Sequence, residues 1–176
     1  MAALQAKGLV FVDESGAHLQ MTRRYGRCRS AERLAGQVPQ KHYRTATVIA
    51  GVRRGGPSAP WIFEGAMNGE MFLAWVRVGL VPTLRKGEVV VLDNLATHKV
   101  HGVRQSIEAV GARLEYLPPY SPDLNPIENM WSKIKGNLRR DEPRTWRQLL
   151  RAAKVAFAAV SATDCQGFFS HAGYAT

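Results

Sequence analysis

The chain has 176 residues, enough for one domain with a sizeable hydrophobic core, and its hydrophobic fraction of 45% is ordinary for a folded protein. Lys and Arg total 24 against 14 Asp and Glu, and the net charge of +10 favours a polyanionic partner such as nucleic acid, although a merely basic surface would give the same number. No apolar stretch approaches the ~20 residues of a membrane span, and Asp13 and Glu14 come too early for a secretory signal peptide.

The N-terminal part of the chain predicts two strands and a loop. Residues 8–12 are an apolar run typical of a buried strand. Residues 17–21 are predicted to be its hairpin partner, with Glu14-Ser15-Gly16 as the turn. The basic residues 23–29 are predicted to form an irregular loop.

The next segment predicts two further strands and a helix. Residues 43–52 are rich in Thr, Val and Ile and predict a third strand, and a short strand is predicted at 61–63. From Asn68 to Leu84 the apolar residues recur at helical spacing, so we expect an amphipathic helix with Pro82 disturbing its end.

The second half alternates strands and helices. Residues 88–92 predict a strand buried on both faces, followed by a helix at 100–110 and a short strand at 113–117. A proline-rich loop is expected at 118–126, and a further helix at 146–160. Early strands followed by alternating strands and helices predict an α/β fold, a mixed five-stranded sheet flanked by helices.

Three carboxylates stand where a site would be expected. Asp13 and Asp93 each close an apolar strand-like run, and Glu128 lies just inside a helix that Pro126 begins and Asn125 is expected to cap. If two parallel strands ended side by side against that helix, the three carboxylates would meet. Such a cluster repels itself unless divalent cations bind it, and hard oxygen ligands suit Mg²⁺ or Mn²⁺. Two such ions are typical of displacement at phosphorus.

Each carboxylate also has a purely structural interpretation. Asp13 and Asp93 could be turn residues that bond their own backbone, and Glu128 is the residue that a capping box requires at the third helical position. The helix after Pro126 presents Glu128, Ser132, Lys135 and Arg139 on one stripe, which would suit a phosphate backbone or be a solvated flank. His98 could contact phosphate or a leaving group, or cap the following helix.

Three segments resemble the catalytic domain of mariner-like insertion-sequence transposases. They are Phe11–Ser15, Val91–Asn94 with His98-Lys99, and Pro118–Asn129, the last of which is highly specific as a string. The 34 residues between Asp93 and Glu128 equal the spacing typical of that family. The resemblance runs from about residue 7 to the helix near 160. It implies a ribonuclease H-like fold, an Asp13-Asp93-Glu128 metal triad, and DNA cleavage followed by strand transfer.

The expected organisation is a single catalytic domain over residues 1–176, with a core at about 7–160. Family members normally carry helix–turn–helix modules before the first catalytic strand, and we expect none here, so a separate or upstream-encoded part would supply them. The implied partners are double-stranded DNA and a second copy of the chain.

Cys28 and Cys165 fit no metal-ligand spacing and no disulfide framework, which favours a reducing cytosol. The expected location is cytoplasmic, in association with the nucleoid. The predicted DNA contacts are Arg23, Arg24, Arg27, Arg29, His98, Lys99, Lys135 and Arg139.

Two alternative functions remain open at this point. A ribonuclease H-like nuclease would cleave without joining ends, although the Pro118–Asn129 string argues against it. A non-catalytic DNA-binding remnant or accessory protein would not need the three acids, all of which are present.

Overall fold

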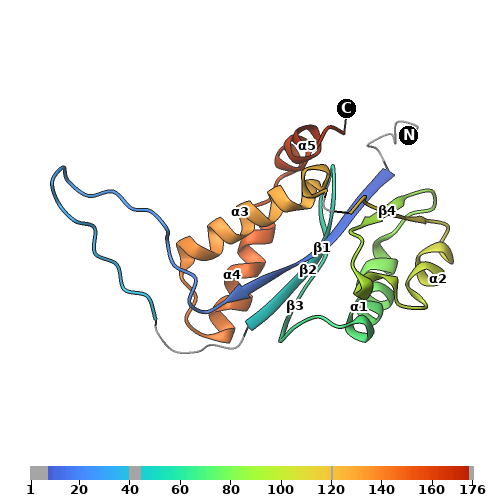
Figure 1. Cartoon of the computed structure of the whole chain (residues 1–176), viewed down its shortest axis with the longest axis horizontal. Coiled ribbons are helices and arrows are strands. Elements are labelled where there is room, and N and C mark those ends of the chain that lie inside the picture. Colours follow the sequence, from blue (N-terminus) through green and yellow to red (C-terminus); the bar gives the residue numbers. More distant parts are fainter. Residues whose placement is uncertain (1–7, 40–44, 120, 175–176) are drawn as a thin grey trace.

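A five-stranded mixed sheet forms the centre of the computed structural model, which describes residues 8–39, 45–119 and 121–174 (Figure 1). The spatial order of the strands is β3-β2-β1-β4-β5. β1 pairs antiparallel with β2 and parallel with β4. The α/β prediction and the five-stranded mixed sheet are therefore confirmed. The strands are β1 (Leu9–His18), β2 (Thr45–Arg53), β3 (Gly56–Glu64), β4 (Val89–Leu92) and β5 (Arg113–Tyr116).

The predicted hairpin inside residues 8–21 is wrong, because β1 continues straight through it. Glu14, Ser15 and Gly16 pair with Ile49, Val48 and Thr47 of β2 instead of forming a turn. The strand therefore does not end at Asp13. β4 runs beside only its first part, with Phe11 opposite Val91 as the last pair, and ends at Leu92.

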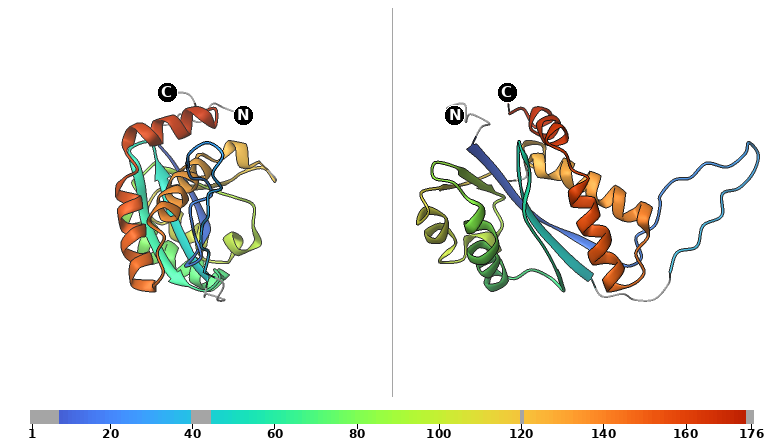
Figure 2. Two further views of the ribbon diagram at one scale, coloured as in Figure 1. Left: turned by 90° about the vertical axis from the view of Figure 1, so that its left-hand side faces the viewer. Right: turned by 180° about the vertical axis from the view of Figure 1, so that it is seen from behind.

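Helices cover both faces of the sheet (Figures 1 and 2). On one face, α3 (Pro126–Asp141), α4 (Trp146–Ala158) and α5 (Ala162–His171) pack on the residues of β1 that include Leu9 and Phe11. On the other face, α1 (Gly69–Trp75) and α2 (Val103–Glu108) pack on Val10 and Val12. Successive side chains of β1 thus enter different cores, as the twofold periodicity of a strand requires.

Several helices differ in length from their predictions. The helix expected from Asn68 to Leu84 is α1 followed by a π-helical segment at Val76–Leu80 and a 3₁₀ turn at Val81–Thr83. The helix expected at 100–110 shortens to α2, after a 3₁₀ turn at Ala96–Lys99. The strand expected at 61–63 is the much longer β3. The predicted strand start at 43 and residue 120 of the proline-rich string lie outside the described residues.

The core extends past its predicted end near residue 160. Ser161 caps α5, since its hydroxyl accepts a hydrogen bond from the Asp164 N–H. The helix buries Cys165 and Phe169 in the same core as α3. Just beyond it, the Tyr174 hydroxyl donates to the carbonyl oxygen of Leu124 at 2.8 Å. This last segment therefore supports the loop that leads into α3.

The basic loop predicted at 23–29 is part of a longer irregular arm, residues 19–39, that extends away from the body (Figure 1). Arg144 fixes its root, with Nη1 donating to the carbonyl oxygens of Leu19 at 3.2 Å and Met21 at 2.9 Å. The Gln20 side chain donates to the carbonyl oxygen of Pro39 at 3.1 Å and so joins the two ends of the arm.

Two further observations concern the described residues alone. None of their helices has the length and apolarity to cross a membrane. Cys28 is exposed and Cys165 is buried, and both are free thiols.

Candidate active site

Asp13 is held in the middle of β1, with only 9% of its surface exposed. Its Oδ1 accepts a hydrogen bond from the backbone N–H of Glu14 at 2.8 Å, and its Oδ2 accepts one from Trp131 Nε1 at 3.2 Å. Trp131 belongs to α3, which packs on this face of the sheet. The carboxylate is therefore oriented by its own strand and by the helix above it.

Asp93 is the first residue after β4, at the carboxyl end of that strand. Extending the β1–β4 pairing of Phe11 with Val91 by two residues places Asp93 level with Asp13. The Asp93 Oδ1 accepts a hydrogen bond from the Leu95 N–H at 3.2 Å, as Asp often does in a turn. Two neighbouring strands thus bring two carboxylates to the same edge of the sheet.

Glu128 lies in the first turn of α3, which begins at Pro126 as predicted. Its side chain is exposed, and no hydrogen bond or ion pair joins it to any residue that the structure describes. A carboxylate near a helix N-terminus is favoured by the helix dipole, so Glu128 needs no cationic partner there. Its carboxylate is therefore available for a ligand.

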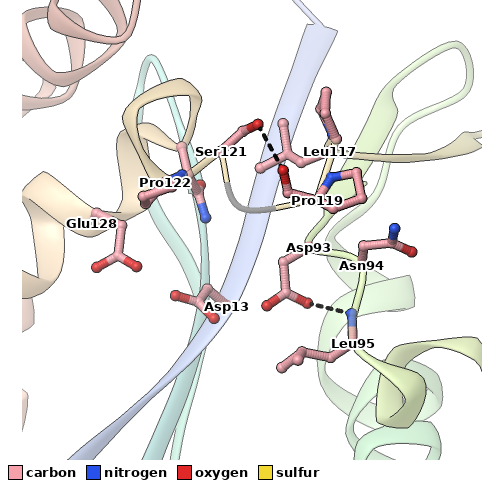
Figure 3. Close-up of a pocket in the computed structure, with 11 residues that line it drawn as sticks. Asp13, Asp93, Asn94, Leu95, Leu117, Pro119, Ser121, Pro122 and Glu128 are labelled. Atoms are coloured by element: carbon pink, nitrogen blue, oxygen red, sulfur yellow. Dashed lines mark hydrogen bonds between the residues drawn. The ribbon is translucent and has the colours of Figure 1, made fainter.

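The three carboxylates face one open pocket of about 380 Å³. Figure 3 shows Asp13 between Glu128 and Asp93, with all three side chains directed toward the same space. The rest of the lining comes from the segment after β4 and from the proline-rich loop before α3. It consists of Asn94, Leu95, Leu117, Pro118, Pro119, Ser121, Pro122 and Asn125.

The charges in this pocket act on one another. Burial, together with the nearby charges of Glu14, Glu128 and Asp93, raises the pKa of Asp13 from 3.8 to about 7, against the hydrogen bond from the Glu14 N–H. Burial would also raise the pKa of Asp93, but the hydrogen bond and charge of His98 and the Leu95 N–H hold it below 3.8. A neighbouring cation would therefore favour the ionised form of Asp13.

The donor set fits a hard divalent cation. All three side chains offer carboxylate oxygens, the ligands that Mg²⁺ and Mn²⁺ prefer. Within residues 8–39, 45–119 and 121–174, no group of three His, Cys, Asp or Glu side chains is close enough to hold a single ion.

His98 was predicted as a possible DNA contact, and that prediction is wrong because the side chain is fully buried. Its Nε2 lies 2.9 Å from Glu14 Oε2, and its Nδ1 lies 2.5 Å from Asp93 Oδ1. Burial would lower the pKa of His98, but the contacts with Asp93 and Glu14 outweigh it and raise the pKa to about 9. The ring is therefore a cation held behind the site.

Asn125 occupies the predicted N-cap position of α3 but does not cap it with its side chain. Glu128 N–H bonds to the Asn125 backbone oxygen at 3.2 Å instead. The side chain lines the pocket, and its buried Oδ1 has no hydrogen-bond partner among the described residues.

The other predicted DNA contacts lie on three parts of the molecule. Arg23, Arg24, Arg27 and Arg29 are exposed on the arm, and Lys99 is exposed beside the Tyr116 ring, 5.6 Å from its centroid. Arg23 is tied to the end of α3, since its Nη2 donates to the Arg140 carbonyl oxygen at 3.4 Å. The remaining two, Lys135 and Arg139, are half-buried on α3 and form no ion pair within the described part of the chain.

Sequence reasoning missed two residues at the site. Trp131 was not among the predicted site residues, yet its ring N–H orients Asp13. Glu14 was assigned to a turn, yet it pairs with His98. The strand alternation that separates Glu14 from Asp13 was a usable signal, whereas nothing in the sequence places the Trp131 N–H against Asp13.

Comparison with known proteins places the chain among nucleases. The family model described as DDE superfamily endonuclease matches residues 8–150. No curated protein sequence matches significantly.

Solved structures of the Mos1 mariner transposase share the fold. The strand transfer complex aligns with a TM-score of 0.73 at 16% identity, over 94% of this chain and 51% of that one. The paired end complex with Mg aligns at 0.71 and 16%, over 95% and 52%. The isolated catalytic domain aligns at 0.69 and 13%, over 94% and 76%. The chain thus spans about half the length of the transposases in these DNA complexes.

Proposed function

Because the chain belongs to the DDE superfamily endonuclease family, we propose that it is the catalytic domain of a mariner-like transposase. It would cleave phosphodiester bonds at transposon ends and join the 3′-hydroxyl ends to target DNA. The observation that carries the proposal is the convergence of Asp13, Asp93 and Glu128 on one open pocket (Figure 3). The ribonuclease H-like fold shared with Mos1 supports it.

Divalent cations fit this pocket on chemical grounds. Asp13 and Asp93 would hold one Mg²⁺ or Mn²⁺ ion between them, and Glu128 would complete the site for a second. Structures of the Mos1 paired end complex with Mg and with Mn support these two metals. The chemistry that two bound ions supply is activation of the attacking oxygen and stabilisation of the leaving oxygen.

The chain's own residues would hold the metal-binding carboxylates in place. Trp131 and the Glu14 N–H fix the Asp13 carboxylate, and Leu95 N–H fixes Asp93. The attacking group is water during cleavage and a DNA 3′-hydroxyl during joining, so no covalent intermediate with the protein is needed. The open side of the pocket, where Glu128 is exposed, admits the DNA backbone.

The proposed partner is duplex DNA, bound through its phosphates. Arg24, Arg27 and Arg29 of the arm and Lys135 and Arg139 of α3 are candidate backbone contacts. The Mos1 paired end complexes support an active assembly with two copies of the chain. A helix–turn–helix part, upstream or separately encoded, would read the transposon ends. Association with the nucleoid follows from DNA as the substrate.

A joining assay tests this function. We would incubate the chain with supercoiled plasmid, Mn²⁺ or Mg²⁺, and a short duplex that ends in a free 3′-hydroxyl. Nicked plasmid and covalently joined duplex are expected from the wild type and from the control Asp141→Asn. Both products should vanish in Asp93→Asn. Asp141 is a suitable control because it lies at the exposed end of α3 and, among the described residues, pairs only with Arg140, at 3.5 Å.

The same assay separates the alternatives. Nicking without joining would identify a nuclease of ribonuclease H type. DNA binding without any metal-dependent product would identify a non-catalytic DNA-binding protein. Equal products from wild type and Asp93→Asn would mean that the carboxylate pocket is not the active site.

A further inference from the structure

The buried ring of His98 connects four elements beside the site. It lies on the 3₁₀ turn that follows β4, and it packs on the Phe72 ring of α1 with centroids 4.4 Å apart. The Tyr116 hydroxyl of β5 donates to the His98 carbonyl oxygen at 3.2 Å. Its ring nitrogens face Glu14 and Asp93. Phe72, Glu14 and Asp93 therefore hold the ring, and Tyr116 holds the His98 backbone.

Both ring nitrogens face carboxylates, which can only accept hydrogen bonds when ionised. The two contacts therefore hold the ring between Glu14 and Asp93. The Nδ1 lies 2.5 Å from Asp93 Oδ1, an ion-pair distance, although its N–H does not point straight at that oxygen.

The two carboxylate oxygens of Asp93 have different surroundings. Oδ1 lies against His98 Nδ1 and also accepts from the Leu95 N–H. Oδ2 takes no hydrogen bond from any residue that the structure describes, and the carboxylate faces the pocket (Figure 3). One oxygen is thus held from behind while the other is left for a ligand.

Glu14 anchors the histidine from the same strand that carries Asp13. Neighbouring strand residues point to opposite faces, so Asp13 faces α3 whereas Glu14 faces the core of α1 and α2. The Glu14 Oε2 lies 2.9 Å from His98 Nε2. β1 therefore positions Asp13 directly and Asp93 through Glu14 and His98.

We propose that Glu14 and His98 are positioning residues that hold Asp93 in its cation-binding orientation, an inference that rests on the proposed function. Partners behind metal-binding carboxylates typically change metal affinity by about 10- to 100-fold when they are replaced. Glu14 and His98 lie behind Asp93 in this way, and of the three residues only Asp93 lines the pocket.

The test measures Mn²⁺ affinity of the DNA-free protein, by the paramagnetic resonance signal of free Mn²⁺. His98→Gln removes the ring that lies against Asp93 Oδ1. We expect a dissociation constant for Mn²⁺ about 10-fold or more higher. His101→Gln, an exposed histidine three residues away, is the control and should match the wild type. Metal-free melting curves show whether each variant folds.

Glu14→Asp provides the second arm, since it keeps the charge but shortens the side chain that reaches His98. Mn²⁺ binding should weaken as in His98→Gln, and the double variant should be no weaker than either single one. Glu115→Asp, on exposed β5, is its control. If His98→Gln fails to fold, the Mn²⁺ affinity of Glu14→Asp tests the positioning role by itself.

Asp93→Asn serves as the reference that separates two kinds of failure. If Asp93→Asn binds Mn²⁺ like the wild type, the proposed metal site itself is wrong. If Asp93→Asn loses binding while folded His98→Gln or Glu14→Asp keeps wild-type affinity, the pocket stands and the positioning role is overturned.

Discussion

Asp13 shows how strongly a single side chain depends on its surroundings. In the unfolded chain its carboxyl would ionise near pH 3.8, whereas burial and neighbouring carboxylates raise its pKa to about 7 in the folded protein. The folded state therefore binds a proton between these values that the unfolded state does not. Each unit of pKa difference corresponds to about 1.4 kcal/mol.

The first prediction concerns the pH dependence of stability without metal. Because the folded-state pKa is the higher one, the contribution of Asp13 to the free energy of unfolding should fall as pH rises from about 4 to 7 and stay level above 7. Asp13→Asn should remove this fall and be more stable than the wild type at pH 7. Urea unfolding at a series of pH values measures both. Parallel stability profiles would contradict the assigned pKa.

Residue types and spacing were enough to single out the three acids that line the pocket, but not their neighbours. Asp13, Asp93 and Glu128 were recognisable because each stands at a predicted element boundary. His98 was assigned to DNA or to a helix cap because its sequence position gives no sign of burial between two carboxylates. Asn125 has a capping residue's position, but its side chain faces the pocket, which only the three-dimensional packing decides.

At the scale of elements, α3 joins the carboxylate pocket to the core. One turn separates Glu128 from Trp131, so the exposed carboxylate and the buried indole that orients Asp13 come from the same rigid helix. Any tilt of α3 would move both together. Residues Ile127, Met130, Ile134 and Leu138 bury the opposite stripe and hold the helix in place.

The second prediction follows from the exposure of Glu128. Glu128→Gln should abolish metal-dependent nicking and joining but leave the fold intact. Loss of a charge favoured by the helix N-terminus costs about 0.3–1 kcal/mol, and relief of repulsion with Asp13 offsets it. The metal-free melting temperature should therefore change little. Plasmid assays and thermal melting measure the two effects, with exposed Glu115→Gln as control. Wild-type cleavage by Glu128→Gln would leave Glu128 with a structural role only.

Elements with strong local patterns were predictable, and those decided by distant pairing were not. The apolar stripe of α3 and the capping box of α4 each depend on residues of a single helix, so the local sequence is enough to predict them. Glu14-Ser15-Gly16 resembles a turn locally, but pairing with β2, some thirty residues later, keeps it extended. α5 went unpredicted even though Ser161 and Asp164 form a capping box, because its apolar pattern is weak.

Across the whole molecule, positive charge is spread over separate surfaces. The arm carries Arg24, Arg27 and Arg29, all exposed and without ion pairs in the described part of the chain. The net charge of +10 gives the chain a general affinity for polyanions. Charge alone fixes no base sequence, since phosphate contacts position a protein without reading bases.

The third prediction assigns part of this affinity to the arm. Each lost phosphate contact lowers the slope of log affinity against log salt by about 0.9, so alanine at Arg24, Arg27 and Arg29 should lower it by up to roughly 2.7. Alanine at Arg147, Arg151 and Lys154, exposed on α4, removes the same charge and should change the slope less. Fluorescence anisotropy across a salt series measures both. Equal slopes for the two triple variants would show that the arm has no special part in binding.

The fourth prediction is that duplex binding is nearly blind to sequence. Base reading requires an element seated in a groove, which the proposed helix–turn–helix part would supply. Affinity for the element's terminal repeat and for scrambled DNA of equal length should differ by less than about tenfold, well below the ratio of a specific binder. A larger preference for the repeat would mean that this domain reads sequence itself.

The opposite orientation of Asp13 and Glu14 makes β1 intolerant of changes in length. Deleting or inserting a single residue between Leu9 and Asp13 would leave every acid in the gene but exchange the two faces of the strand. A glutamate would then stand beneath α3, and an aspartate, one methylene shorter, would face His98. Frame-preserving indels in this short stretch should therefore inactivate copies of such an element as surely as loss of an acid. Inactive copies are to be recognised by the length of this strand as well as by their residues.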